Sequence, residues 1–251
     1  MIALLAAIGI MSAMDQEAAL IRDTIQEKEI VQVGCREFIK GTFEGVPVVF
    51  TLSGVGKVSA ATTAALLIAK FGVDEIVFTG VAGGGKGVEI GDVVIGHTYL
   101  QHDIDTRPFF PQFYVHSLSK QTLPADQKLI ARMKAAADRF FANGIAFPSL
   151  GILNPQVREG VIVSGDQFVG AAHHEKIVDS TKDVLPNGFH AIEIEGAAVA
   201  QVCNELEVPF VVLRAISDKA NHEAAVDFLT FMDQVASLYS HGILKEYFQA
   251  N

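Results

Sequence analysis

The sequence predicts an α/β fold: a single domain over residues 1–251, with a twisted central mixed β-sheet flanked by helices. Short apolar runs typical of buried strands alternate along the chain with longer stretches whose apolar residues recur at helical spacing. Residues 46–53, 58–70 and 75–79 form the clearest case, because a strand, an Ala-rich helix and a second strand in this order indicate a parallel crossover. Hydrophobic residues make up 50% of the chain, which is enough for a substantial buried core.

The N-terminal part begins with an apolar run over residues 1–11, which we expect to form a first buried strand. No Lys or Arg precedes this run, as one would in a signal peptide, and the run is too short to span a membrane. We therefore expect a cytoplasmic protein. A helix should start near Asp15, because acidic residues in its first turn precede apolar residues at helical spacing. Residues 36–43 and 46–53 are typical of two strands joined by a Glu-Gly turn.

The remaining elements keep the mixed order. Further strands are expected at residues 92–97, 159–164, 189–194 and 209–216, and helices at about 125–142, 195–206 and 225–247. The segment from Gln101 to Leu123 contains prolines and aromatic residues without a clear period, so we expect a long functional or interfacial loop there.

Charge and composition narrow the class of partner. A net charge of -10 repels phosphate backbones and anionic lipids, so we expect a small neutral or zwitterionic substrate and neither nucleic acid nor a membrane. The two cysteines, Cys35 and Cys203, lack the spacing of a zinc site. Residues 102–105 and 173–174 contain His without a convincing third donor at ligand spacing, so we expect no metal.

Four strand ends finish in small or polar residues, and in open α/β sheets ligands bind beyond the carboxyl ends of strands. Residues 79–87 are rich in glycine, which lets a ligand approach the backbone closely. A dinucleotide fingerprint is disfavoured because residues 88–92 lead into a strand and not a helix. A tight turn without ligand is the competing interpretation. At the second end, residues 164–168, Phe168 taken alone is more typical of a core residue than of a surface that stacks on a ligand.

The third and fourth ends carry charge. Strand alternation places Glu193 and Glu195 on one face, where like charges among apolar residues are costly unless they have hydrogen-bond partners. A solvated edge strand would also explain them. Arg214 lies inside the apolar run 209–218, and a buried guanidinium needs acceptors, which these glutamates or a ligand hydroxyl could supply. Asp218 at the end of this run could alternatively cap a helix.

Six segments in collinear order resemble the 5'-methylthioadenosine/S-adenosylhomocysteine nucleosidases, a branch of the nucleoside phosphorylase family, over nearly the whole chain. These segments are residues 9–17, 53–57, 79–84, 164–168, 193–195 and 214–218. The resemblance implies a nucleoside phosphorylase-like fold, a role in methionine salvage, and no cofactor. It also implies hydrolysis of the N-glycosidic bond of both nucleosides, which releases adenine and the 5-thio-substituted ribose.

The resemblance also implies residue roles. Asp218 protonates the departing adenine at N7, Glu17 activates the attacking water, and Glu195 binds the ribose hydroxyls. Phe168 stacks on the base and the Val169 backbone reads the adenine edge. The other expected site residues are Met14, Ile194 and Arg214 around the ribose and water, together with Val81, Ala82, Gly83, Glu193 and Ser217.

These residue types suit the chemistry independently of the resemblance. Cleavage of an N-glycoside builds positive charge on the sugar and negative charge on the purine, so carboxylates stabilise the first and a proton donor relieves the second. At an unperturbed pKa only about one Asp in a thousand is protonated at pH 7. Asp218 should therefore have a pKa raised by burial or take its proton as substrate binds.

Some positions depart from the family pattern. Val81 stands where many relatives have Ser, so hydroxyl help in placing the water is absent, and Ile194 replaces a frequent Met of similar volume. Residues 219–226 are shorter than in some relatives and lack their aromatic residue, and the first seven residues extend slightly beyond the usual start.

Water is the expected nucleophile, because the phosphate-binding elements of the related phosphorylases are missing. Neither their Gly-Asp-Pro-x-Arg loop near the first strand nor their Arg before the Gly-rich turn is present. Two alternatives stay open at this point. A futalosine-type nucleoside hydrolase shares the fold and much of the site, and a catalytically silent nucleoside-binding protein would lack Asp218 or Glu17.

A homodimer is also expected. Phe109, Phe110, Phe113 and Tyr114, punctuated by Pro108 and Pro111, would form a larger apolar surface than a soluble monomer usually exposes. Relatives cover this surface with a neighbouring subunit, and two-fold association is the commonest oligomer. The loop from Gln101 to Leu123 would then help to enclose the 5'-substituent pocket of the partner.

Overall fold

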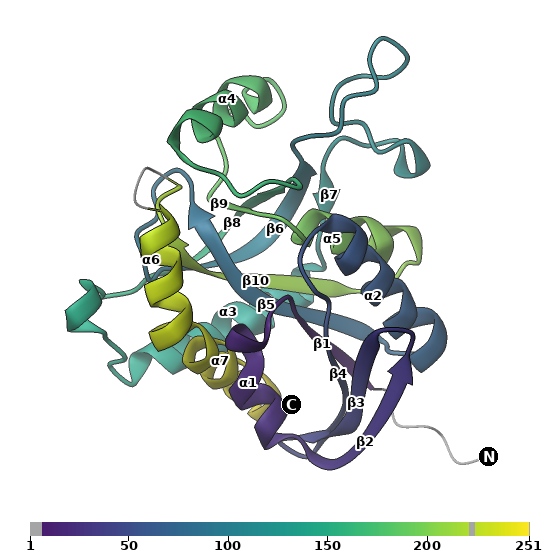
Figure 1. The fold of residues 1–251 in the computed structure, drawn as a ribbon, viewed down its shortest axis with the longest axis vertical. Helices are drawn as coiled ribbons and strands as arrows, with labels where there is room; N and C mark the ends of the chain where they lie inside the picture. The colour runs from purple at the N-terminus through teal and green to yellow at the C-terminus, as the bar shows by residue number, and fades with distance from the viewer. Residues whose placement is uncertain (1–6, 221–223, 251) are drawn as a thin grey trace.

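Helices pack on both sides of a twisted mixed sheet in the computed structural model, which describes residues 7–220 and 224–250 (Figure 1). The strands are β1 (Ile8–Ser12), β2 (Gln26–Val33), β3 (Arg36–Phe43), β4 (Val46–Leu52), β5 (Glu75–Gly84), β6 (Val93–Gln101), β7 (Leu123–Pro124), β8 (Val157–Ser164), β9 (Ala191–Glu193) and β10 (Phe210–Asp218). The main helices are α1 (Asp15–Thr24), α2 (Lys57–Phe71), α3 (Gln127–Ala142), α4 (Ala171–Thr181), α5 (Gly196–Glu205), α6 (Ala224–Phe231) and α7 (Ser237–Gln249).

The sheet follows the order β10-β6-β8-β9-β5-β1-β4-β3-β2. An additional pairing of β10 with β5 closes β10, β6, β8, β9 and β5 into a ring. Strands β4, β1, β5 and β10 are parallel to their neighbours in this series, so their carboxyl ends meet at one edge. Ligands of α/β sheets bind at such an edge, which makes it the place to look for a site.

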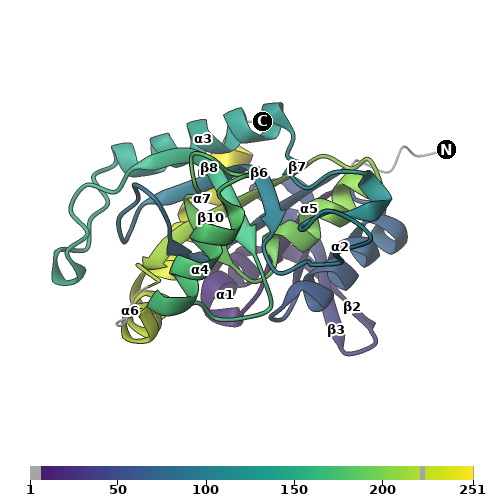
Figure 2. The same cartoon turned by 90° about the horizontal axis from the view of Figure 1, so that it is seen from above.

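The two helical layers differ in which elements they contain. Helices α1 and α3 both pack against α7, and α2 packs against α5 on the other side of the sheet (Figures 1 and 2). The central strands are therefore covered on both faces, and all nine residues of β10 are buried. This double burial explains why β10 reads as a continuous apolar run in the sequence.

Most of the predicted elements are confirmed, with the following differences. The strand expected at 75–79 continues to Gly84, so the interpretation as a tight turn was wrong for residues 79–84, and only Lys86 and Gly87 form a turn. The helix expected at 225–247 consists of α6, a π-helical segment over Met232–Ala236 and α7. Strand β2, the two-residue strand β7 and helix α4 were not predicted. Residues 1–6 of the expected first strand lie outside the described residues.

The segment from Gln101 to Leu123 is largely irregular beyond the end of β6, as predicted, but its aromatic residues do not form one surface. Phe109 is 84% exposed and Phe110 is 38% exposed, whereas Phe113 is only 2% exposed. Phe113 packs in a small core cluster with Leu100 and Val163. The prediction that Phe113 belongs to an exposed apolar surface was therefore wrong.

Of the helices formed by residues 7–220 and 224–250, none is long and apolar enough to cross a membrane.

Candidate active site

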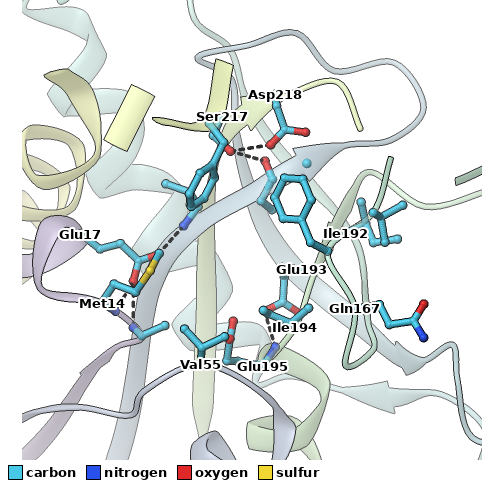
Figure 3. A pocket seen from close by; sticks show the side chains of 17 residues that line it. Met14, Glu17, Val55, Gln167, Ile192, Glu193, Ile194, Glu195, Ser217 and Asp218 are labelled. Atoms are coloured by element: carbon cyan, nitrogen blue, oxygen red, sulfur yellow. Dashed lines mark hydrogen bonds between the residues drawn. The ribbon is translucent and has the colours of Figure 1, made fainter. Parts of the chain in front are cut away.

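A pocket of about 290 Å³ opens at the edge where the parallel strands end (Figure 3). Its walls come from the chain directly after β1 and β4, from the carboxyl ends of β5 and β10, and from the segments that follow β8 and β9. The lining residues are Ala13, Met14, Glu17, Val55, Val81, Ala82, Gly83, Gln167, Phe168, Val169, Ile192, Glu193, Ile194, Glu195, Ser217, Asp218 and Phe228.

Glu17 lies in the first turn of α1 and is only 3% exposed. Its Oε2 accepts hydrogen bonds from the backbone N–H groups of Ala13 (2.9 Å) and Met14 (2.8 Å), and its Oε1 accepts one from Val81 N–H (3.1 Å). Burial raises the pKa of Glu17, and the nearby Arg214 guanidinium and these hydrogen bonds oppose that effect. The carboxyl group is thus buried, fixed in orientation and in the pocket wall.

Asp218 is the last residue of β10 and is 2% exposed. A register shift between Ile216 and Asp218 interrupts the pairing of β10 with β5. Such an irregularity breaks the strict alternation of side chains, and Ser217 and Asp218 both line the pocket. Asp218 accepts hydrogen bonds from Ala220 N–H (2.8 Å) and Ser217 Oγ (2.9 Å). Burial nevertheless raises the pKa of Asp218, so this carboxyl group holds a proton to higher pH than an ordinary Asp.

Arg214 lies behind the pocket wall and binds the two glutamates. Its Nη2 lies 2.7 Å from Glu193 Oε2 and 3.8 Å from Glu195 Oε2. Glu193 also accepts hydrogen bonds from Glu195 N–H, from Gly196 N–H and from the Ser164 hydroxyl. Glu193 is therefore saturated by partners within the protein. Of the acceptors considered for Arg214, which were these glutamates or a ligand hydroxyl, Glu193 is the one that the structure shows. The alternative of a solvated edge strand was wrong, since β9 lies between β5 and β8.

Glu195 keeps more of its hydrogen-bonding capacity for a ligand than Glu193 does. Its Oε1 accepts a hydrogen bond from Gly56 N–H (2.9 Å), and its Oε2 has only the long contact with Arg214. Burial and the neighbouring Glu193 charge raise the pKa of Glu195 to about 8, although Arg214 acts in the opposite direction. Glu195 lies beyond the end of β9, at the position that precedes α5, so strand alternation does not continue to it.

Two polar groups approach the backbone of Gly80 closely. A Cβ atom on Gly80 would lie 2.7 Å from Arg214 Nη1 and 2.8 Å from Glu17 Oε1. Among the described residues, Arg214 Nη1 is buried and has no hydrogen-bond partner. A donor and a carboxylate thus border the same spot, which is possible only because residue 80 has no side chain.

Aromatic and aliphatic side chains form the rest of the pocket. Phe168 is 55% exposed and its ring lies 5.8 Å from the ring of Phe228, edge to face. Phe168 is therefore not the core residue that its sequence context alone favoured. Met14, Val55 and Ile192 add apolar surface (Figure 3). The pocket combines apolar walls with a few buried carboxyl groups.

All the residues predicted for the site line this pocket except Arg214, which lies behind it. Five lining residues were missed: Ala13, Val55, Gln167, Ile192 and Phe228. Three of them are neighbours of predicted residues in the motifs, so the motifs were read too narrowly. Residues 219–226 lack the aromatic residue that some relatives have in this region. Phe228 of α6 supplies an aromatic side chain just beyond them. Residues 221–223 of that region lie outside the described residues.

Comparison with known proteins gives a consistent result. The family model described as "Phosphorylase superfamily" matches residues 7–249. The 5'-methylthioadenosine/S-adenosylhomocysteine nucleosidase of Anoxybacillus flavithermus is 34% identical over 239 residues, which cover 95% of this chain and 96% of that protein.

Solved structures agree with the sequence comparison. The corresponding nucleosidase of Neisseria meningitidis, in complex with methylthio-immucillin-A, is similar with a TM-score of 0.85 and 34% identity, covering 98% of this chain and 100% of that one. A futalosine hydrolase mutant of Helicobacter pylori is also similar, with a TM-score of 0.81 and 31% identity over 98% of this chain and 100% of that one. Since a family model covers nearly the whole chain and the structural matches extend over the same length, the chain belongs to the phosphorylase superfamily.

Proposed function

We propose that this protein hydrolyses the N-glycosidic bond of 5'-methylthioadenosine and S-adenosylhomocysteine, releasing adenine and the 5-thio-substituted ribose. One observation carries the proposal: two buried carboxyl groups with raised pKa values, Glu17 and Asp218, reach one largely apolar pocket from separate elements (Figure 3). Hydrolysis of a glycosidic bond needs one group that takes a proton from water and one that gives a proton to the leaving group. The similarity to nucleosidases named for these two substrates supports the choice of substrate.

Asp218 is the proposed proton donor. The purine accumulates negative charge as the bond breaks, and protonation at N7 relieves it. The raised pKa of Asp218 keeps its proton available at a higher pH than an ordinary Asp would. Phe168 at the pocket wall stacks on the base, and the backbone of the neighbouring Val169 reads the adenine edge.

Glu195 is the proposed ligand of the ribose hydroxyls. Its Oε1 is held by Gly56 N–H, which leaves Oε2 for the sugar. Glu193, which is saturated by Arg214 and backbone groups, supports Glu195 and does not act on the substrate directly. Met14 and Ile194 pack beside the ribose.

The attacking water is placed between Arg214 and Glu17 in this mechanism. Arg214 Nη1, which has no hydrogen-bond partner among the described residues, donates a hydrogen bond to it and Glu17 Oε1 accepts its proton, since both atoms lie near the Gly80 backbone. Val81, Ala82 and Gly83 line the adjoining wall, and Val81 contributes its backbone N–H to Glu17. Water needs no hydroxyl from residue 81 when these two groups already orient it.

Water suits this site better than phosphate does. Neither Lys nor Arg is among the residues that line the pocket in the described parts of the chain, whereas four carboxyl groups are. Phosphate recognition typically uses Arg, Lys or a helix N-terminus aimed at the anion. A phosphate dianion would be repelled by the ionised Glu17, so phosphorolysis is disfavoured.

No observation of this site favours the two alternatives over this proposal. The futalosine hydrolase of Helicobacter pylori shares the fold, but nucleosidases named for methylthioadenosine match at equal or higher TM-scores. A silent nucleoside-binding protein is disfavoured because Asp218 and Glu17 are both present and both line the pocket.

The proposal extends to the setting of the reaction. We place the enzyme in the cytoplasm, in methionine salvage and the recycling of S-adenosylmethionine by-products, and as a homodimer. Phe109 is a large side chain that is almost fully exposed, and Val55 and Val58 at the pocket rim and the start of α2 are 54% and 78% exposed. A partner subunit that covers these exposed apolar side chains would remove them from water.

Two substitutions test the roles of the carboxyl groups. Asp218→Asn keeps the shape of the side chain and loses the transferable proton, so adenine release should fall by about 10²-fold or more while a nucleoside analogue still binds. Glu17→Gln should likewise lower kcat strongly, because an amide cannot accept the proton of water. An Asp218→Asn enzyme within threefold of wild type would remove Asp218 from the acid role. A Glu17→Gln enzyme that loses only affinity would make Glu17 a binding residue.

A further inference from the structure

Lys57 connects three loops around the pocket, although it does not line the pocket itself. Its ammonium group binds Asp103 and donates a hydrogen bond to Gln101 Oε1 (3.2 Å), at the end of β6. Its backbone N–H donates a hydrogen bond to Asp166 Oδ1 (3.0 Å), in the segment after β8. The Lys57 side chain is only 13% exposed, so water screens these contacts less than it screens a surface ion pair.

Asp103 and Asp166 are joined by more than one contact. Asp103 takes the ammonium of Lys57 on Oδ1 and accepts a hydrogen bond from Asp166 N–H on Oδ2 (2.9 Å). The ammonium also lies 3.9 Å from Asp166 Oδ2. Two carboxylates that lie this close repel each other unless a cation lies between them. The charge of Lys57 therefore holds the segment after β8 against the segment after β6.

Two groups of the proposed substrate site depend on this arrangement. Phe168 follows Asp166 by two residues, so the position of Asp166 sets where the aromatic ring lies. Gly56 directly precedes Lys57, and its N–H donates the 2.9 Å hydrogen bond to Glu195 Oε1. Gly56 has a φ of +97°, a backbone conformation that favours glycine and that turns its amide toward Glu195.

We infer that Lys57 is a positioning residue for nucleoside binding, whose cation holds Phe168 and Glu195 at the spacing that the base and the ribose of one substrate require. The inference rests on the proposed function, because it assigns those two residues to the base and the sugar. Glu17 and Asp218 are held by other groups, namely the start of α1, β5 and the end of β10. Loss of the cation should therefore affect substrate affinity far more than the chemical step.

Steady-state kinetics with methylthioadenosine test this inference through Lys57→Met, Lys57→Arg and a control. The Met variant should raise KM by about tenfold or more and change kcat by less than about threefold, because the groups that lose their support act in binding. The Arg variant restores a cation and should recover most of the affinity. Lys134→Met removes a surface pair between Lys134 and Asp138 and should leave both constants unchanged.

A measurement without substrate separates this inference from the proposed function. Amide hydrogen exchange at Gly56 and Asp166 should accelerate in Lys57→Met and stay unchanged in Lys134→Met, whatever nucleoside the enzyme uses. If the wild type does not act on methylthioadenosine while the Lys57→Met variant still shows faster exchange, the proposed function is contradicted. The inferred role of Lys57 in holding the loops together still stands in that case. Unchanged exchange together with a KM within twofold of wild type would overturn the inference, as would a loss confined to kcat.

Asp103→Asn provides a second route if Lys57→Met does not fold. This change keeps the size of the side chain and removes the charge that Lys57 binds. It should raise KM in the same direction, and the double variant Lys57→Met/Asp103→Asn should be clearly less impaired than the product of the two single effects. Full additivity of the two changes would contradict a shared network.

Discussion

Glu17 and Asp218 differ in how many hydrogen bonds support their charged forms. Glu17 accepts three backbone N–H groups, whereas Asp218 accepts one backbone N–H and one hydroxyl. Hydrogen bonds to a carboxylate favour its ionised form and burial disfavours it. The better supported Glu17 is thus suited to accept a proton, and the less supported Asp218 is suited to carry one. This contrast gives a structural reason for the assignment of base and acid.

The raised pKa of Glu17 predicts how activity depends on pH. A base must be ionised, so kcat/KM should fall as pH decreases through the pKa of Glu17, and burial places that fall above the ordinary value of 4.5. On the alkaline side, kcat/KM should fall as Asp218 in the free enzyme loses the proton that burial helps it to hold. A pH series for methylthioadenosine, with enzyme stability checked at each pH, measures both limbs. A kcat/KM that stays constant down to pH 4.5 would contradict a buried carboxylate base.

The residues with charge or an aromatic ring at strand ends were predictable from the sequence, because such residues are unusual within apolar runs. Arg214 is the clearest example, since its need for acceptors pointed to Glu193 and Glu195. Val55 and Ile192 were not predictable, because an aliphatic residue in a pocket wall has the same sequence signature as one in the core. Phe228 was missed because its position depends on how α6 packs over the strand ends.

At the scale of elements, β5 shows how a strand can also form a site. Its glycines leave room for side chains that come from β10 and α1, and the sheet pairing with β10 and β9 continues through them. A glycine-rich run after an apolar strand therefore does not by itself indicate a turn. Tertiary pairing decided the conformation, and no local pattern revealed it.

A substitution in β5 tests the proposed water site. The Cβ of a Gly80→Ala variant would lie too close to Arg214 Nη1 and to Glu17 Oε1 for these groups to stay in place. We expect kcat to fall by about 10²-fold or more, with binding of a nucleoside analogue largely kept, because the two groups that orient the nucleophile would be displaced while the base and ribose contacts remain. Product release and analogue binding are measured on the same preparation.

Gly242→Ala is the matched control for steric crowding. Its Cβ would clash with the ring of Phe140 at the contact between α3 and α7, away from the pocket. This variant should lower the melting temperature and leave kcat unchanged. If Gly80→Ala behaves in the same way, with reduced stability and normal kcat, the water is not held between Arg214 and Glu17.

Two of the elements that were not predicted, β2 and α4, have weak sequence patterns for physical reasons. Strand β2 lies at the edge of the sheet and is mostly exposed, so it lacks the apolar run that marks the central strands. In helix α4 only Ile177 and Thr181 are buried, which gives almost no apolar face. Patterns of burial reveal the elements that form the core, and these two elements take little part in it.

At the scale of the whole molecule, the proposed homodimer can be tested on the exposed aromatic residues. Phe109→Ala should weaken the dimer and raise KM for methylthioadenosine, because Phe109 is 84% exposed and available to a partner. Sedimentation velocity and kinetics measure the two effects. A Phe109→Ala protein with unchanged association and unchanged KM would contradict a pocket shared between subunits.

Phe113 serves as the control for this test. Phe113 is buried within its own subunit, so Phe113→Ala should destabilise the fold by about 3–5 kcal/mol, as is usual for a large aromatic residue in a core. Its main effect should therefore be a lower melting temperature, with any loss of association following from that. If Phe113→Ala weakened the dimer as much as Phe109→Ala and kept the wild-type melting temperature, Phe113 would not be buried within its own subunit.

The whole molecule also explains why hydrolysis is the expected reaction. The parallel strands bring their ends to one edge, and the carboxyl groups that gather there make a pocket suited to a neutral nucleoside and unsuited to phosphate. The strongly negative net charge of -10 acts in the same direction.

The most direct test of the account is to identify the products formed from methylthioadenosine, with and without inorganic phosphate. We predict adenine and methylthioribose at the same rate in both conditions. Formation of methylthioribose 1-phosphate, or adenine release that requires phosphate, would contradict hydrolysis as the reaction of this enzyme.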